Sequence, residues 1–282
     1  MPVNQLQNGT WVVPYPSQVP LPRNVASFFP AEDDNRPGLG CYDVELGAMN
    51  MVPLGMLDPN REDIRCMLDH LEDFWFLSEG WKDYPAAASQ NDWFNLGGFS
   101  KVQPNLCRVA EIYAALDEIK PFVRSYFNFI TPQINKQNLT FWEDFTPDSG
   151  AWGSTEGSGY FLLLTRIMLL MERGEELWLA PLVTDQWLNN GMEVAVQDAP
   201  TRFGTTSYRI NSFTDRGYIE AEINPPTRSS PKEIVIRLRH PQGKRIRAVT
   251  VNGAQHTAFD AARDIIRLEP ATEKFYVKAH YD

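Results

Sequence analysis

The spacing of apolar residues changes near residue 174, and this change constrains the fold more than any other feature of the sequence. Before Gly174 the spacing is helical: in "NREDIRCMLDHLEDFWFL" the apolar residues fall at i, i+3, i+4, i+7, i+10 and i+11. After Gly174 apolar and polar residues alternate, with turn residues every eight to twelve positions, as in "GYIEAEINPP". We therefore expect a helical part followed by an antiparallel β-sandwich of roughly eight strands.

This pattern predicts an α+β, multidomain chain with three parts. An extended N-terminal arm covers residues 1–38, a helical domain covers residues 39–174, and the β-sandwich covers residues 175–282. In "VAEIYAALDEIKPFVRSYFNFI" two helical runs are joined or kinked at Pro121. The run "GYFLLLTRIMLLMERG" is apolar on nearly every side, so we expect a helix that is covered all round.

Charge and composition exclude several classes of partner. The 26 basic and 36 acidic residues give a net charge of −10, and "HPQGKRIR" is the only short basic cluster, so nucleic acid is not an expected partner. No apolar segment reaches 18 residues, and the N-terminus lacks the features of a signal peptide. We expect no membrane partner and a cytoplasmic location, with secretion left open if the sequence is a fragment.

The histidines and cysteines do not form a metal-binding pattern. The chain has four histidines and three widely spaced cysteines, and it contains neither C-x-x-C nor H-x-x-x-H. We therefore expect no metal and no cofactor, and the cysteines are interpreted as buried thiols.

One stretch, "FWEDFTPDSGAWGSTEGSGYFLLLTR" at residues 141–166, gathers carboxylates, flat rings and glycines before the apolar helix. Glycosidic hydrolysis needs an acid for the leaving oxygen and a second carboxylate. Glu143 lies among aromatic residues, where desolvation favours the protonated form and suits a general acid. Glu156 falls in the first helical turn, where the helix dipole suits a base or nucleophile. In the alternative interpretation, Glu156 only stabilises a helix start and Glu143 is a surface loop residue.

A second cluster, "EGWKDYPAAASQNDWFNLGGFSKVQPN", lies between predicted helices and supplies Asp92 as a reserve catalytic acid. The expected substrate-binding residues of both stretches are Trp81, Tyr84, Trp93, Gln103, Trp142 and Trp152. Alternatively, Trp81 and Trp93 fill gaps in the core and Asp92 caps a helix. Among the acids inside helices, Glu111 is the one to reconsider, because Arg108 and Tyr113 flank it.

Three segments carry a resemblance to a known family: "SYFNFITPQINKQNLTFWEDF", "LWLAPLVTDQWLNNGMEVAVQDAPTRFGTTSYRINS" and "EIVIRLRHPQGKRIRAVTVNG". Over residues 40–255 the chain resembles the C-terminal part of large bacterial α/α-toroid glycoside hydrolases, in which a helical ring with the active site precedes a β-sandwich. The resemblance implies a glycoside hydrolase with a carbohydrate substrate. The five or six helices predicted here are fewer than a complete ring needs, so we expect an incomplete toroid. Its exposed apolar helix faces predict a homo-oligomer.

Two functions that need no catalysis stay open. A partial toroid with a β-sandwich can serve as a non-catalytic glycan-binding module, or as an assembly subunit for a separate catalytic chain. An enzyme needs two carboxylates that converge on one aromatic-lined pocket, whereas a binding module needs only rings and amides.

Overall fold

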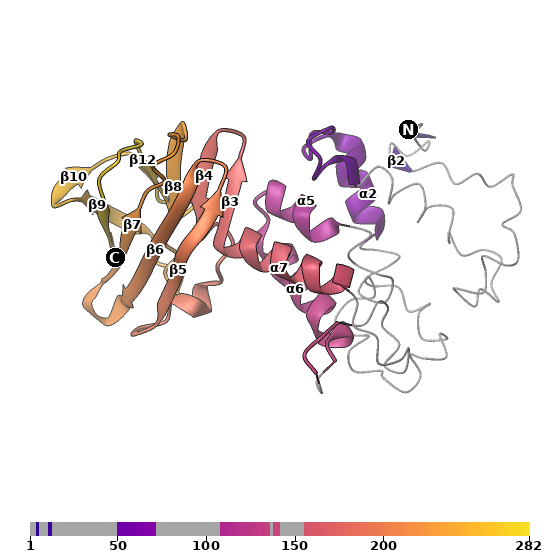
Figure 1. Cartoon of the computed structure of the whole chain (residues 1–282), viewed down its shortest axis with the longest axis horizontal. Coiled ribbons are helices and arrows are strands. Elements are labelled where there is room, and N and C mark those ends of the chain that lie inside the picture. The colour runs from indigo at the N-terminus through magenta and orange to yellow at the C-terminus, as the bar shows by residue number, and fades with distance from the viewer. Residues whose placement is uncertain (1–3, 6–10, 13–49, 72–107, 136–137, 142–154) are drawn as a thin grey trace, which may run out of the picture. The chain divides into compact units, whose positions relative to one another are not determined.

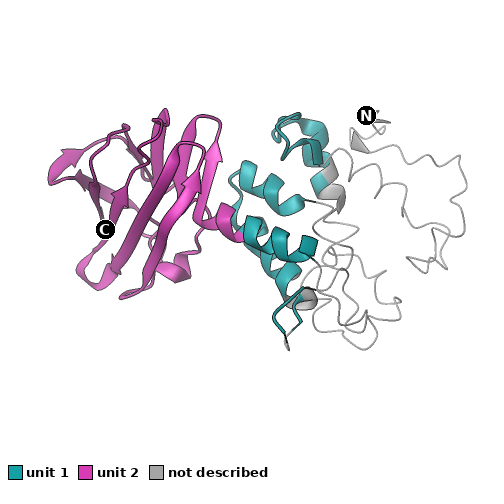
Figure 2. Cartoon of the chain, viewed as in Figure 1, with its two compact units in different colours: residues 1–164 teal, residues 165–282 magenta. Residues whose placement is uncertain are grey.

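The structure is a computed structural model of the whole chain, shown in Figure 1, and it describes residues 4–5, 11–12, 50–71, 108–135, 138–141 and 155–282. The described residues have an α+β architecture, with helices in the N-terminal part and two mostly antiparallel sheets in the C-terminal part. The chain divides into two compact units, residues 1–164 and 165–282 (Figure 2). This division lies ten residues before the domain boundary expected from the sequence.

Four helices and one short ladder are described in the first part of the chain. The helices are α2 (Glu62–Leu71), α5 (Val109–Ala115), α6 (Ile119–Gln133) and α7 (Thr155–Leu169), and the ladder pairs β1 (Asn4–Gln5) with β2 (Trp11–Val12). The expected N-terminal arm at residues 1–38 otherwise lies outside the described residues, and the toroid ring stays a prediction. None of the helices in the described residues has the length and apolar content needed to cross a membrane.

The break between α5 and α6 precedes Pro121 and does not coincide with it. Asp117 takes a left-handed backbone conformation, with φ of 63°, and the Glu118 N–H donates to the Tyr113 carbonyl at 2.9 Å to close the turn. Pro121 consequently stands in the first turn of α6, where the missing N–H leaves no helical hydrogen bond unmade. The predicted pair of helical runs is confirmed, and the position of the join moves to residues 116–118.

Aromatic rings hold α6 to the start of α7. We call Tyr126, Phe129, Phe141, Tyr160 and Phe161 the aromatic cluster. Phe129 stacks on Phe141 with ring centroids 5.2 Å apart, and the Tyr160 ring meets Phe129 edge-on at 5.2 Å. Phe161 packs against Phe141 at 5.1 Å and against Tyr126 at 6.1 Å. The cluster therefore links Phe141, which precedes residues 142–154, to Tyr160 and Phe161, which follow them.

The expectation for the apolar run after Ser158 is wrong in two respects. The run is not covered all round: Tyr160, Leu164 and Met168 form a buried stripe, but the Leu162 side chain is 66% exposed. The helix also ends at Leu169, and the next residue begins a strand. The Leu169 carbonyl accepts hydrogen bonds from the Ala180 N–H and the Tyr208 hydroxyl, both at 2.7 Å. These two bonds join the last residue of the helix to the β-sheet unit.

The second unit contains strands β3 to β13 and two short 3₁₀ helices. The strands are β3 (Leu170–Arg173), β4 (Glu176–Leu179), β5 (Glu193–Thr201), β6 (Gly204–Phe213), β7 (Tyr218–Asn224), β8 (Glu233–Arg237), β9 (Ile246–Val251), β10 (Ala254–His256), β11 (Phe259–Asp260), β12 (Ile265–Leu268) and β13 (Phe275–Tyr281). The 3₁₀ helices are η5 (Asp185–Leu188) and η6 (Thr214–Arg216).

These strands form one six-stranded and one five-stranded sheet. The strand orders are β10-β9-β13-β7-β6-β5 and β11-β12-β8-β4-β3. Antiparallel pairing dominates, as predicted, but β4 runs parallel to β8, so the expectation of an entirely antiparallel sandwich is wrong at this pair. The parallel register aligns Leu177 with Ile234 and Leu179 with Ile236, which are fully buried.

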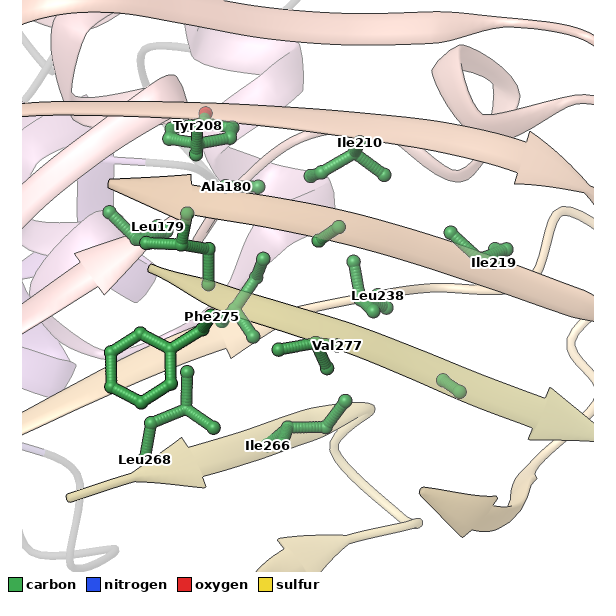
Figure 3. Close-up of a cluster of buried hydrophobic side chains, with 14 of the residues drawn as sticks. Leu179, Ala180, Tyr208, Ile210, Ile219, Leu238, Ile266, Leu268, Phe275 and Val277 are labelled. Atoms are coloured by element: carbon green, nitrogen blue, oxygen red, sulfur yellow. The ribbon is translucent and has the colours of Figure 1, made fainter. Parts of the chain in front are cut away.

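Alternating side chains from both sheets build one hydrophobic core, part of which Figure 3 shows. Ile210, Ile219 and Val277 come from the six-stranded sheet, and Leu179 and Ile266 come from the five-stranded sheet; all are at most 1% exposed. Strands such as β6, β7 and β13 thus bury their apolar face and leave the other more exposed, which is the reason the sequence predicts them.

Candidate functional site

Of the predicted site residues, the described part of the chain includes Glu156. The others lie outside the described residues: Glu143, Asp92, Trp81, Tyr84, Trp93, Gln103, Trp142 and Trp152. The predicted convergence of Glu143 and Glu156 on one pocket therefore stays a prediction.

Glu156 stands where the sequence predicts it, in the first turn of α7, and its side chain is exposed to solvent. Four residues later on the same helix, Tyr160 is 7% exposed and belongs to the aromatic cluster. Positions i and i+4 are neighbours on a helix surface, so the carboxylate lies one turn from the cluster. The helix dipole favours a negative charge in the first turn of a helix.

A buried ion pair at the start of α5 lies near the same tyrosine. The Arg108 Nε and Nη2 atoms donate to the two carboxylate oxygens of Glu111 at 2.7 and 2.6 Å, and Glu111 is 9% exposed. The hydrogen bond to Glu111 raises the pKa of Arg108, and the nearby Tyr160 phenol acts in the same direction. Both oxygens of Glu111 are thus engaged, which suits an anchor for Arg108 better than an acid that exchanges protons with a substrate.

The sequence singled out Glu111 because Arg108 and Tyr113 flank it, and in the structure Arg108 forms an ion pair with it. Arg108 directly precedes α5 and has a left-handed backbone conformation, with φ of 49°. The sequence does not predict that the ion pair of Arg108 and Glu111 is buried, because its burial depends on which other elements pack against α5.

A cleft with a volume of about 440 Å³ opens between α2, α5 and α6. We call it the cationic cleft, and its lining residues are Arg65, Leu68, Tyr113, Glu118, Lys120, Pro121 and Arg124. Arg65 of α2 forms an ion pair with Glu118, the residue before α6. The sequence did not predict this cleft, because Arg65 and Glu118 are 53 positions apart in the chain. The local sequence feature that points to the cleft is the i, i+4 spacing of Lys120 and Arg124.

In the part of the chain that the structure describes, no group of three or more His, Cys, Asp or Glu side chains is arranged to hold a metal ion.

Comparison with known proteins gives remote structural similarity and no sequence match. No protein-family model matches the chain, and no curated protein matches it. One similar solved structure is described as a glycoside hydrolase, with a TM-score of 0.31, 11% identity, and coverage of 64% of this chain and 31% of that chain. A second is described as a GH127 β-arabinofuranosidase, with a TM-score of 0.28, 10% identity, and coverage of 70% and 32%. The chain thus spans about a third of the length of these proteins.

Proposed function

We propose that the chain is a glycoside hydrolase that cleaves a glycosidic bond in an oligosaccharide or glycoside, with Glu143 as general acid and Glu156 as base or nucleophile. The observation that carries the proposal is the position of Glu156: an exposed carboxylate in the first turn of α7, one turn from a cluster of packed aromatic rings. The resemblance of three sequence segments to toroid glycoside hydrolases supports the same chemistry.

Covalent connection limits how far Glu143 can lie from this site. Glu143 follows Phe141 by two residues, and two residues span at most about 7 Å. Glu156 precedes Phe161 by five residues, which is about 7.5 Å of helix. The rings of Phe141 and Phe161 pack 5.1 Å apart, so these spans set an upper limit on the separation of the two glutamates and leave both stereochemical outcomes open.

The remaining residues complete the proposed site. Trp142 directly precedes Glu143, and Trp152 lies between the two glutamates in the sequence. The proposed contacts to sugar rings and hydroxyls are these two tryptophans with Trp81, Tyr84, Trp93 and Gln103. Asp92 is the reserve acid if Glu143 does not act. No cofactor is required for this mechanism, because the two carboxylates carry all proton transfers.

The test is release of nitrophenol from a panel of aryl α- and β-glycosides by the full chain, with and without Glu156→Gln. Loss of the carboxylate should lower kcat/KM by at least about a hundredfold, the usual contribution of a positioned acid or base. Glu175→Gln is the matched control, because Glu175 is an exposed glutamate of the β-sandwich unit. It should leave the rate unchanged.

Equal rates for the wild type and Glu156→Gln, at unchanged circular dichroism, would remove Glu156 from the mechanism. Saturable glycan binding without turnover of any substrate would contradict the hydrolase and favour the glycan-binding module.

A further inference from the structure

The turn between β8 and β9 contains a buried histidine. His240 is 2% exposed, whereas Gln242, Gly243 and Lys244, which follow it, are exposed. The Gly243 N–H donates to the His240 carbonyl at 2.9 Å, and the Gln242 N–H donates to Nδ1 of the His240 ring at 3.1 Å. The imidazole is thus part of the hydrogen bonding that closes this turn.

The hydrogen bond at Nδ1 specifies which form of the imidazole fits the turn. A ring nitrogen that accepts a hydrogen bond carries no proton, so the proton of the neutral ring is on Nε2. An imidazolium carries a proton on both nitrogens, so its Nδ1 would present a hydrogen to the Gln242 N–H. Protonation of His240 consequently removes the hydrogen bond from Gln242.

The second ring nitrogen does not compensate for this loss. Within the described residues, Nε2 of His240 is buried and has no hydrogen-bond acceptor. Burial and the positive charge of Lys244 both lower the pKa of His240. A buried imidazolium would lack an acceptor and would lie near a like charge, and both effects raise its free energy.

The neighbouring elements do not supply a counter-charge to the ring. The centroid of the Tyr281 ring of β13 lies 5.0 Å from that of the imidazole, and the Tyr281 hydroxyl donates to the Leu238 carbonyl at 2.6 Å. Burial and the nearby Asp264 carboxylate raise the pKa of Tyr281, so this phenol stays neutral. The charge of Asp264 is itself opposed by that of Arg239. In the part of the chain that is described, no carboxylate forms an ion pair with His240.

The turn can open while the strands on either side stay in the core. Ile236 of β8 is fully buried and Ile246 of β9 is 3% exposed, whereas the three residues after Pro241 are exposed. Segments with few buried contacts open at a lower free energy than the core around them. Opening of this turn is therefore the least costly way to bring a charged His240 into water.

We propose that His240 is an acid-sensitive latch: the neutral ring closes the turn at residues 240–243, and the protonated ring leaves its buried position and opens the turn while both sheets stay paired. The latch is independent of the proposed hydrolase, because it involves neither Glu143 nor Glu156. Since the pKa of His240 is lowered, closure is favoured above pH 6.5, and opening increases as the pH falls from 6.5 through the lowered value. Each pH unit in this window should raise the open population about tenfold.

The experiment is hydrogen exchange of the full chain followed by NMR between about pH 4 and pH 7.5, with each amide rate divided by that of an unstructured peptide at the same pH. Protection of the Gln242 amide should fall about tenfold per unit as the pH falls below 6.5. The Ile236 amide of β8 should stay protected at least about a hundredfold more strongly than that of Gln242. The His240 ring, titrated in the same samples, should show a pKa below 6.5.

Two substitutions test the latch in different ways. An asparagine side chain can accept the N–H two residues further on, as Nδ1 does, but it does not titrate, so protection of Gln242 in His240→Asn should not vary with pH. Lys244→Gln removes the like charge and should move the opening to higher pH, by up to about 0.5 unit. The matched controls are Lys232→Gln and His256→Gln, an exposed lysine and a second histidine of the same unit, and both should keep the wild-type profile.

Four results would each overturn the proposal: protection of Gln242 that does not vary with pH in the wild type, the same fall in His240→Asn, equal protection of Ile236 and Gln242 at every pH, or a pKa of His240 at or above 6.5. If His240→Asn does not fold, the wild-type profile and its shift in Lys244→Gln still decide. The readout is exchange and not turnover, so these results would leave the hydrolase proposal untouched.

Discussion

At the scale of single residues, Asp264 is the carboxylate whose environment most disfavours its charge among the described groups with a resolved shift. Burial beside strand β12 raises the pKa of Asp264 from 3.8 to about 6, although the guanidinium groups of Arg239 and Arg237 act in the opposite direction. The backbone of Asp264 is left-handed, with φ of 57°, and its carbonyl accepts the Leu238 N–H at 2.9 Å, so the residue is held in this position.

The raised pKa makes stability depend on pH with a defined sign. The folded state binds the proton of Asp264 more tightly than the unfolded state, so the contribution is fully present below pH 3.8 and is lost as the pH rises through about 6. Asp264→Asn stays neutral, so it should gain free energy of unfolding relative to the wild type between pH 4.5 and 7.5, by at most about 3 kcal/mol. Urea denaturation of both proteins across this range measures the difference.

A difference between Asp264→Asn and the wild type that does not vary with pH would contradict this prediction. Both proteins must be measured over the same pH range, because His240 makes the free energy of unfolding depend on pH with the opposite sign. Burial lowers the pKa of His240, so its contribution is present above pH 6.5 and is lost as the pH falls through the lowered value. His240 is unchanged in the variant, so its effect cancels in the difference.

The local sequence predicts the position of Glu156 but does not predict the cationic cleft. Glu156 was located correctly because a helix start is a local property of glycine, threonine and the apolar residues that follow. The pairing of Arg65 with Glu118 joins positions 53 residues apart, and it depends on the packing of α2 against the start of α6. No local pattern encodes such a contact, so the cationic cleft was not predicted.

At the scale of elements, the Leu169 carbonyl is one of the groups that join the end of α7 to the sheets, and the Met168 carbonyl accepts the Leu182 N–H beside it. The Leu169 carbonyl receives the Tyr208 hydroxyl and the Ala180 N–H, which join the end of the helix to the two sheets. Tyr208→Phe removes one donor and leaves the other, so the carbonyl keeps a partner. We expect a loss of about 1 kcal/mol in the free energy of unfolding, the net value of an ordinary hydrogen bond.

Chemical denaturation of Tyr208→Phe against Tyr276→Phe checks this value. Tyr276 is 56% exposed on β13, so removal of its hydroxyl should change the free energy of unfolding by less than about 0.5 kcal/mol. A loss above about 3 kcal/mol for Tyr208→Phe would mean that the carbonyl does not keep its second donor.

The strands divide into those that the sequence predicts and those that it does not. Strands β5, β6, β7, β9 and β13 follow from alternation of apolar and polar residues. Strand β8 is buried on both faces, since Ile234, Val235 and Ile236 are all fully buried, and its short run of β-branched residues is what predicts it. Strands β3 and β4 occur in "LMERGEELWL", directly after an apolar helix, so the helical period hides the first of them. The parallel pair of β4 and β8 is formed by segments about 57 positions apart, and nothing in either segment specifies its direction.

At the scale of the whole molecule, the two units rest on separate cores. In the first unit, aromatic rings of α6 and α7 pack with Phe141. In the second unit, the core of the two sheets is drawn entirely from residues 169–281. The helical unit keeps large apolar side chains on its surface, with Phe127 46%, Leu139 74% and Leu162 66% exposed. Exposed apolar surface of this kind is a candidate for an interface.

The predicted homo-oligomer can be tested on this surface. We expect the full chain to sediment as a multiple of 32.2 kDa, and we expect the double variant Phe127→Glu, Leu162→Glu to sediment as a single chain. Two buried charges at a subunit interface without partners disfavour association strongly. Met192→Glu is the control, because Met192 is 51% exposed in the β-sandwich unit and should not alter the mass. A wild-type mass of 32.2 kDa, or equal dissociation of the control, would refute the interface.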